Sequence, residues 1–124
     1  MTLCHWRYRL NKLAKIRSVR VQQQNGVCYY CRQPMCSGEL SEYASRYGMT
    51  LRAAARLQAT AEHLVARCEG GSDTLENIVA ACRFCNSIRH FAKHPLPPEA
   101  YGEKARKRLS RGKWHGFIAR SEAA

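Results

Sequence analysis

The chain has 124 residues, of which 45% are hydrophobic and 24% charged, so we expect one domain with a modest core rather than a disordered chain. Lysine and arginine total 21 against 9 aspartate and glutamate, and the formal net charge of +12 favours a polyanionic partner through release of counterions from phosphates. No stretch approaches the ~18 consecutive apolar residues of a membrane-spanning helix, and no basic amphipathic helix rich in Trp and Phe indicates a membrane surface.

The cysteine content gives an expectation about the compartment. Residues 1–18 are basic, but no apolar segment or cleavage site of a secretory signal follows them, so we expect the protein in the cytoplasm. In that reducing environment, seven cysteines are better explained as metal ligands and free thiols than as disulfides.

The first third of the chain predicts helices. In residues 1–25, basic side chains accompany apolar residues about three positions apart, which predicts a basic helix over 8–24. Its charged face either is solvated or contacts phosphates, and both interpretations stay open. Residues 37–58 predict a helical segment with Gly48 as a C-cap and Thr50 capping a second, Ala- and Arg-rich helix.

The middle of the chain predicts two short strands and a helix. The strands are expected at 59–66 and 78–80, joined by a loop that contains Gly70-Gly71. The helix is expected to follow Cys82 and to reach about Lys93. Beyond it, 95–124 is interpreted as a basic tail, because three prolines interrupt the pattern. Aromatic residues near the two termini, which either stack on bases or pack internally, are His5, Trp6, Trp114 and His115.

Two Cys-x-x-Cys pairs are the strongest single signal: Cys28/Cys31 and Cys82/Cys85. Two intervening residues let both thiolates of a pair reach one ion, and two pairs complete a tetrahedral, all-sulfur site that selects Zn²⁺. Such a closed site is expected to be structural and coupled to folding. An alternative is that Cys36 or Cys68 replaces one of these ligands; otherwise the free thiols are Cys4, Cys36 and Cys68.

A second group of residues lies between and after the cysteine pairs. In chain order it comprises Glu62-His63, the Gly70-Gly71 loop, Asn77, and Asn86 directly after Cys85. The run 62–86 resembles the HNH endonuclease family, whose pattern is an acidic residue and His on a strand, a Gly-Gly loop, a central Asn, and Cys-x-x-Cys followed by His or Asn. Including Cys28 and Cys31, the resemblance covers about half of the chain.

The resemblance implies a small α+β fold: a ββα-metal core stapled by a Cys4 zinc site, with flanking helices. One domain then spans 1–124, with a basic N-terminal helix in 1–25, a zinc and ββα core in 26–94 that contains the insertion 37–58, and the tail 95–124. The insertion either reads DNA, mediates dimer contacts or packs on the core, and packing is favoured.

The resemblance also implies the chemistry of phosphodiester hydrolysis. His63 is the expected general base, because a neutral imidazole accepts a proton from water near neutral pH. Glu62 and Asn86 are the expected ligands of a catalytic Mg²⁺, Mn²⁺ or other divalent ion, since both offer hard oxygen atoms. His90 follows Asn86 by four residues, on the same helical face, and is either a third ligand or a basic residue near phosphate.

Further roles come from the same comparison. Asn77 either pins the loop between the strands or orients His63 through a hydrogen bond; an ordinary turn residue is the alternative. Arg89, Arg83 and Lys93 are expected to contact nucleic acid. Adjacent residues on a strand point to opposite faces, so Glu62 and His63 act together only if the backbone bends there. Glu62 and Ala66 stand where relatives more often have Asp and Pro.

The sequence therefore predicts a metal-dependent DNA endonuclease, with double-stranded DNA as the expected partner, no membrane partner and a homodimer as an option. A short stand-alone chain resembles phage or bacterial members of the family. Two alternatives are a zinc-binding module that binds nucleic acid without cutting it and a structural protein of a nucleoprotein assembly. Both account for the cysteines and the charge but leave His63, Asn77 and Asn86 unexplained.

Overall fold

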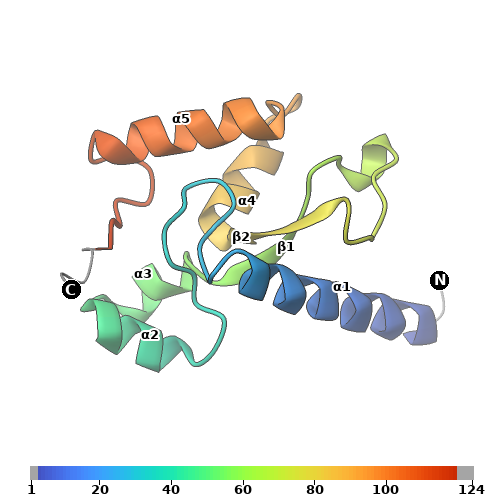
Figure 1. Cartoon of the computed structure of the whole chain (residues 1–124), viewed down its shortest axis with the longest axis horizontal. Helices are drawn as coiled ribbons and strands as arrows, with labels where there is room; N and C mark the ends of the chain where they lie inside the picture. The colour runs from blue at the N-terminus through green and yellow to red at the C-terminus, as the bar shows by residue number, and fades with distance from the viewer. Residues whose placement is uncertain (1–2, 120–124) are drawn as a thin grey trace.

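A computed structural model describes residues 3–119, with residues 3–6 described only as backbone. The elements in chain order are α1 (Leu3–Gln23), α2 (Leu40–Tyr47), α3 (Leu51–Ala55), β1 (Ala59–His63), a single 3₁₀ turn (Arg67–Glu69), β2 (Ile78–Cys82), α4 (Arg83–Phe91) and α5 (Pro98–Ser110) (Figure 1). The fold is α+β, with a small two-stranded sheet among helices, as predicted.

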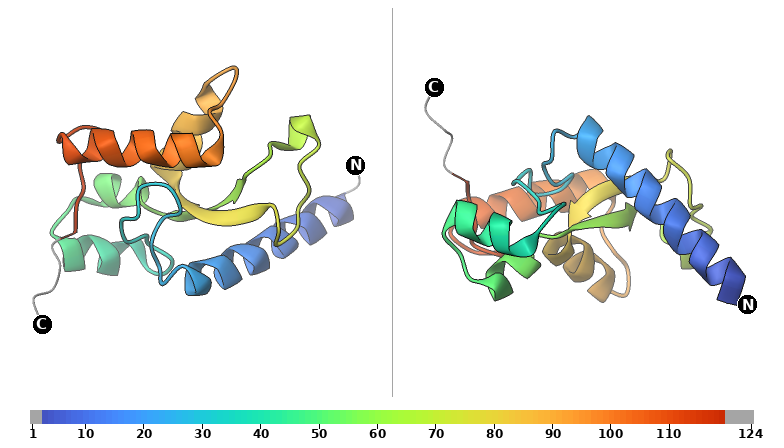
Figure 2. Two further views of the ribbon diagram at one scale, coloured as in Figure 1. Left: turned by 45° about the horizontal axis from the view of Figure 1, so that its top comes forward. Right: turned by 90° about the horizontal axis from the view of Figure 1, so that it is seen from below.

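The sheet is an antiparallel pair whose register runs from Ala59 opposite Cys82 to His63 opposite Ile78. Every residue of β2 is buried, and its sequence is a continuous apolar run. Such a run is expected where other elements cover both faces of a strand. Here α1 and α4 lie on opposite sides of the β-hairpin (Figure 2). The strand pair and α4 together form the predicted ββα unit.

The predicted insertion 37–58 contains two short helices. Gly48 ends α2 in the left-handed conformation (φ 65°), and the Thr50 side chain accepts a hydrogen bond from the Ala53 amide at 3.1 Å to begin α3. Both caps are those predicted from the sequence. The insertion packs on the core through buried side chains, which are Tyr43, Ala44, Ala54 and Leu57.

The region 95–124 was predicted as a basic tail, and this prediction is wrong for residues 98–110, which form α5. Pro98 is the first helical residue, a position where the missing amide hydrogen and fixed φ of proline are tolerated. Tyr101, Ala105 and Leu109 are buried at a spacing of four residues, so the helical period was present in the sequence. The prolines mark the beginning of a helix, not the end of the folded domain.

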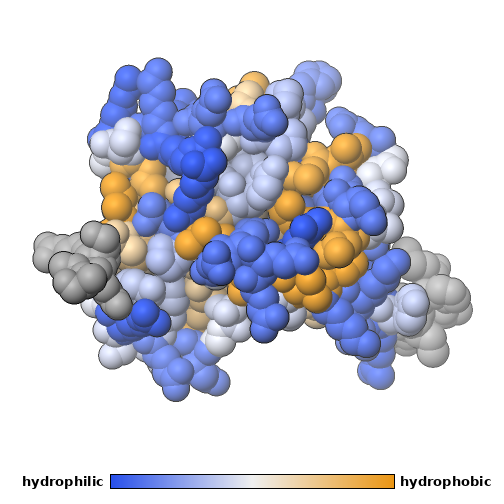
Figure 3. All heavy atoms as spheres, in the orientation of Figure 1, coloured by the Kyte–Doolittle hydropathy of each residue, from blue (hydrophilic) through white to orange (hydrophobic). Residues whose placement is uncertain are grey.

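The outer surface carries many hydrophilic side chains. On the face shown in Figure 3, hydrophilic side chains surround smaller hydrophobic areas. Among the helices that the structure describes, none combines the length and the apolar character needed to cross a bilayer.

Candidate functional site

Four cysteines converge where β2 meets α4. Cys28 and Cys31 lie in the loop after α1, Cys82 ends β2, and Cys85 lies in the first turn of α4. Their sulfur atoms all lie within 4.8 Å of one another, and each residue is at most 2% exposed. The structure thus brings together the four cysteines that the sequence singled out. Of the other cysteines, Cys36 is buried and Cys68 exposed, both free thiols, whereas the side chain of Cys4 lies outside the described part.

Backbone amides support the sulfur atoms. The amides of Tyr30 and Cys82 donate to the Cys28 sulfur at 3.4 and 3.3 Å, and the Cys85 amide donates to the Cys82 sulfur at 3.4 Å. Hydrogen bonds of this kind stabilise thiolate ligands and orient them for a metal ion. The neighbouring cysteine side chains, together with His115, lower the pKa of Cys31. This set of four sulfur donors therefore fits a Zn²⁺ ion.

The segment after α5 covers the cysteine cluster. The Trp114 indole donates to the Cys85 sulfur at 3.2 Å, and the His115 ring lies 3.4 Å from the Cys31 sulfur through Nε2. Trp114 also packs edge-on against Phe84 and Tyr101. The sequence placed these two residues in a basic tail, and packing was the more frequent role assigned to aromatic residues there. Their role as neighbours of the cluster was not predicted.

A second group of polar residues lies between β1 and α4. Glu62 is only 1% exposed, and its Oε2 accepts hydrogen bonds from the Tyr30 hydroxyl at 3.0 Å and from Arg89 at 3.3 Å. Its Oε1 lies 2.6 Å from Nε2 of His90, whose side chain is 32% exposed. Burial, followed by the Glu62 charge, raises the pKa of Tyr30, so its hydroxyl remains a donor. One carboxylate oxygen is therefore held from inside the protein, and the other faces His90 near the surface.

Asn86 joins this group from the preceding turn of α4. Its Nδ2 donates to the Thr60 hydroxyl at 3.0 Å and to the Ala61 carbonyl at 3.3 Å. Because a carbonyl only accepts, Nδ2 must face the strand, and Oδ1 is directed elsewhere. The step from Asn86 to His90 is four helical residues, a rise of ~6 Å, and the step from Thr60 to Glu62 is two strand residues, a rise of ~6.6 Å. Because the two rises are nearly equal, each of these helix residues lies beside its partner on β1. The structure thus places Glu62, Asn86 and His90 along one face of the hairpin.

His63 points to the other side of the strand. Its Nε2 lies 2.7 Å from Oδ1 of Asp73, a residue of the loop between the strands, and Arg9 of α1 donates to Oδ2 of Asp73 at 2.8 Å. Burial raises the pKa of Asp73, but the hydrogen bonds from His63 and Arg9 outweigh it and bring the pKa to about 2. A charged carboxylate at Nε2 favours the tautomer with a proton there, which leaves Nδ1 as an acceptor. Asp73 was not among the residues predicted from the sequence.

The alternation of β1 therefore separates Glu62 from His63, as the strand geometry predicted. Among the described side chains, no hydrogen bond joins His63 to Glu62, Asn86 or His90. Arg89 connects the two sides through the backbone, because it donates both to Glu62 and to the His63 carbonyl at 3.1 Å.

Asn77 fastens the loop between the strands. Its Oδ1 accepts from the Val65 amide at 2.9 Å, and its Nδ2 donates to the carbonyls of Val65 at 3.0 Å and Ser72 at 2.9 Å. Gly71 packs so closely that an added Cβ would lie 1.7 Å from the Val65 carbonyl oxygen. These contacts are those of the loop-holding role, and among the described residues Asn77 makes no bond to the His63 ring.

The three residues expected to contact nucleic acid differ in placement. Arg89 is 5% exposed and donates to Glu62 and to the carbonyls of His63, Leu64 and Leu96. This placement gives Arg89 an internal role as a support for Glu62. Arg83 and Lys93 are exposed, at the beginning of α4 and just beyond its end.

The match to a known family covers this part of the chain. The model of the HNH endonuclease family matches residues 51–92, from the first residue of α3 to the residue after α4. Residues 51–92 form an HNH domain. Comparisons with curated proteins and with solved structures found no match.

The HNH domain depends on residues that flank the matched segment. Cys28 and Cys31 supply half of the cysteine cluster, and Tyr30 supplies a hydrogen bond to Glu62. From the other end of the chain, Arg106 donates to the Tyr30 carbonyl at 2.8 Å, and the Tyr101 hydroxyl donates to the Cys85 carbonyl at 2.6 Å. The flanking loop and helix therefore complete the site instead of only surrounding it.

Proposed function

We propose that this protein is a metal-dependent endonuclease that hydrolyses phosphodiester bonds in DNA. The observation that carries the proposal is the arrangement inside the HNH domain. Glu62, Asn86 and His90 lie on one face of β1 and α4, and a carboxylate-held His63 follows directly on the same strand. A net charge of +12 supports a polyanionic substrate.

His63 serves as the general base in this proposal. Its Nε2 is engaged by Asp73, so Nδ1 is the atom left to accept a proton from the attacking water. Asp73 fixes the ring orientation, and Arg9 in turn fixes Asp73. Asn77 has a different task, because it holds the loop that carries Asp73 against the end of β1.

The oxygen and nitrogen donors between β1 and α4 fit a divalent metal ion. Glu62 offers Oε1, Asn86 offers Oδ1, and His90 offers Nε2; one carboxylate, one amide oxygen and one imidazole suit Mg²⁺, Mn²⁺ or a first-row transition metal. When bound, such an ion supplies Lewis acidity to the scissile phosphate and the leaving oxygen. Tyr30 and Arg89 support the site by holding the second oxygen of Glu62.

The cysteine cluster has the opposite character, and we propose that it holds a structural Zn²⁺. All four ligands are sulfur atoms and are buried, so a tetrahedral ion there has no open position for a substrate. This proposal assigns the two metals to different places: a tight zinc under Trp114 and His115, and a weaker divalent ion at the edge of the hairpin.

Conversion of supercoiled plasmid by the zinc-loaded protein tests the nuclease. Magnesium, manganese or nickel is added or omitted, and zinc content is measured throughout, so that loss of the structural ion is not mistaken for loss of activity. We expect cutting only with an added divalent ion. His63→Ala should lower the rate by ~10²- to 10⁴-fold, the usual contribution of a general base.

His94→Ala is the matched control, because His94 is an exposed histidine just beyond α4. It should cut at the wild-type rate. Nicked product indicates one active site per encounter, and linear product indicates a dimer. A folded, zinc-loaded protein that binds the plasmid but leaves it intact with every metal would contradict the proposal and favour a binding module without catalysis.

A further inference from the structure

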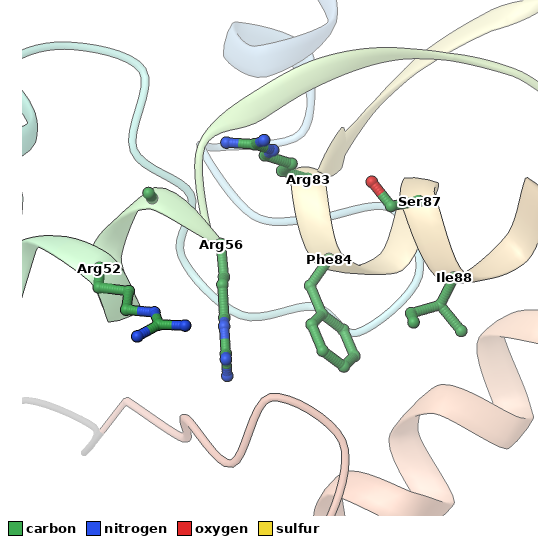
Figure 4. A pocket seen from close by; sticks show the side chains of 7 residues that line it. Arg52, Arg56, Arg83, Phe84, Ser87 and Ile88 are labelled. Carbon is green, nitrogen blue, oxygen red and sulfur yellow. The ribbon is translucent and has the colours of Figure 1, made fainter. Parts of the chain in front are cut away.

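A pocket of about 370 Å³ lies between α3 and the beginning of α4, beside the proposed active site. Three arginines border it: Arg52 and Arg56 from the insertion, and Arg83 from α4. Figure 4 shows the side chains of Arg52 and Arg56 extending to the same side of the chain as the Phe84 ring. No acidic residue lines this pocket.

The three guanidinium groups of this pocket are not engaged with other side chains or with the backbone of the described residues. All three residues are exposed, and among the described residues none of the three side chains has a hydrogen bond or an ion-pair partner. Arg89 differs, because its guanidinium group donates hydrogen bonds to four acceptors inside the protein. Arg52 and Arg56 place two unneutralised positive charges on one side of this hollow, and Arg83 adds a third at its border, so a polyanion is attracted there.

The walls of the pocket are held in place by the backbone. The Phe84 amide donates to the Arg56 carbonyl at 2.9 Å, and the Arg83 amide donates to the Gln58 carbonyl at 2.9 Å. These two bonds fasten the end of the insertion to the first turn of α4. The Phe84 ring is itself fixed by edge-on packing against Trp114 and His115. The backbone positions of Arg56 and Arg83 are therefore set before any ligand arrives.

The helix connects this pocket to the proposed catalytic face. At ~100° per residue, Arg83 and Ser87 lie on the side of α4 next to that of Asn86 and His90. Ser87 also lines the pocket and adds a hydroxyl donor. A nucleic-acid strand that reaches Asn86 and His90 can continue along α4 into the arginine pocket without crossing the helix.

We infer that this pocket binds the phosphate backbone of the DNA, beside the phosphate that is cut, and that the insertion supplies two of its three arginines. The inference rests on the proposed function for its substrate and adds a task for residues 37–58. Phosphate contacts of this kind set the position of the strand and do not read its sequence.

The test measures equilibrium binding to a labelled DNA duplex by fluorescence anisotropy, without added divalent ion and in a His63→Ala background. A triple variant replaces Arg52, Arg56 and Arg83 by Gln. The matched control replaces Arg7, Lys12 and Lys15 by Gln; these are exposed residues of α1, across the sheet from α4. Zinc content and circular dichroism verify that both variants are folded.

We expect the pocket variant to bind on the order of tenfold more weakly at ~100 mM salt. Its log Kd should depend less steeply on log salt, by about 2 to 3, since each lost phosphate contact removes ~0.9 from the slope. The α1 variant should change affinity much less. An equal loss in both variants, or no loss in the pocket variant, would overturn the inference. Because this assay needs no cutting, arginine-dependent binding by an inactive protein would refute the nuclease but keep the pocket.

Discussion

Two groups of donor side chains with opposite properties meet at α4. At its beginning, Cys82 and Cys85 complete a cluster of four soft sulfur ligands that is almost wholly buried. Asn86, directly after Cys85, and His90, one turn further along the helix, offer hard or intermediate donors together with Glu62, and the His90 side chain is 32% exposed. The same helix therefore carries a closed group of donors and the open group to which we assign the catalytic ion.

The difference shows how a small domain combines rigidity with reactivity. The closed cluster ties the loop after α1 to the ββα unit, so a metal there contributes to folding. The open set leaves donor atoms for a metal, water and substrate. Hydrogen bonds to the second oxygen of Glu62, from Tyr30 and Arg89, preorganise the open site without occupying its outer side.

The largest expected effect comes from breaking the closed site. Cys82→Ser removes one sulfur ligand at the junction of β2 and α4, and we expect loss of most zinc affinity and of cooperative unfolding, because structural zinc contributes on the order of 10 kcal/mol to folding. Zinc content and thermal denaturation measure this. Cys68→Ser, which alters an exposed free thiol, should leave both unchanged. If the Cys82→Ser protein still binds zinc and still unfolds cooperatively, the cluster is not the metal site that stabilises the fold.

Variants of Glu62 and His90 are expected to affect cleavage and stability to different extents. Glu62→Gln should abolish metal-dependent cutting and also lower the free energy of unfolding by ~3 kcal/mol, because it leaves the buried Arg89 without its charged partner. His90→Gln should reduce cutting with a stability change below ~1 kcal/mol, since its side chain is partly exposed. Denaturant titrations and cleavage rates compare the two. If both variants lower the free energy of unfolding equally, the exposed side of this group is as important for stability as its buried side, and the contrast with the cysteine cluster is lost.

A smaller effect is expected from the partner of His63. Asp73→Asn keeps the shape of the side chain but removes the charge that favours a proton on Nε2, and we expect kcat to fall on the order of tenfold, less than the loss of the base itself. KM should stay within about twofold, because Asp73 is not proposed to touch the substrate.

Glu76→Gln, an exposed carboxylate in the same loop, is the control for Asp73→Asn and should leave kcat unchanged. Nitrogen chemical shifts of the His63 ring report the tautomer directly. An unchanged rate and unchanged ring shifts in Asp73→Asn would remove Asp73 from the mechanism.

Much of this protein follows from local sequence. The spacing of Cys28/Cys31 and Cys82/Cys85 predicts the cluster, because two intervening residues suit one ion regardless of the rest of the fold. Gly48 and Thr50 predict the helix ends of the insertion, since caps are local hydrogen-bonding motifs. The order of Glu62, His63, Asn77 and Asn86 indicated the HNH domain before any contact was known.

Only the tertiary structure decided which side chains meet. Asp73 faces His63 because the loop between the strands folds back, and Arg9 reaches Asp73 across 64 residues of sequence. Arg89 is buried against Glu62, although the family resemblance had suggested contact with substrate. Trp114 and His115 return from beyond α5 to the cysteine sulfurs. The reason is physical. Sequence spacing determines which side chains meet within one helical turn or one Cys-x-x-Cys pair, whereas the partners of a buried charge come from whichever elements pack over it.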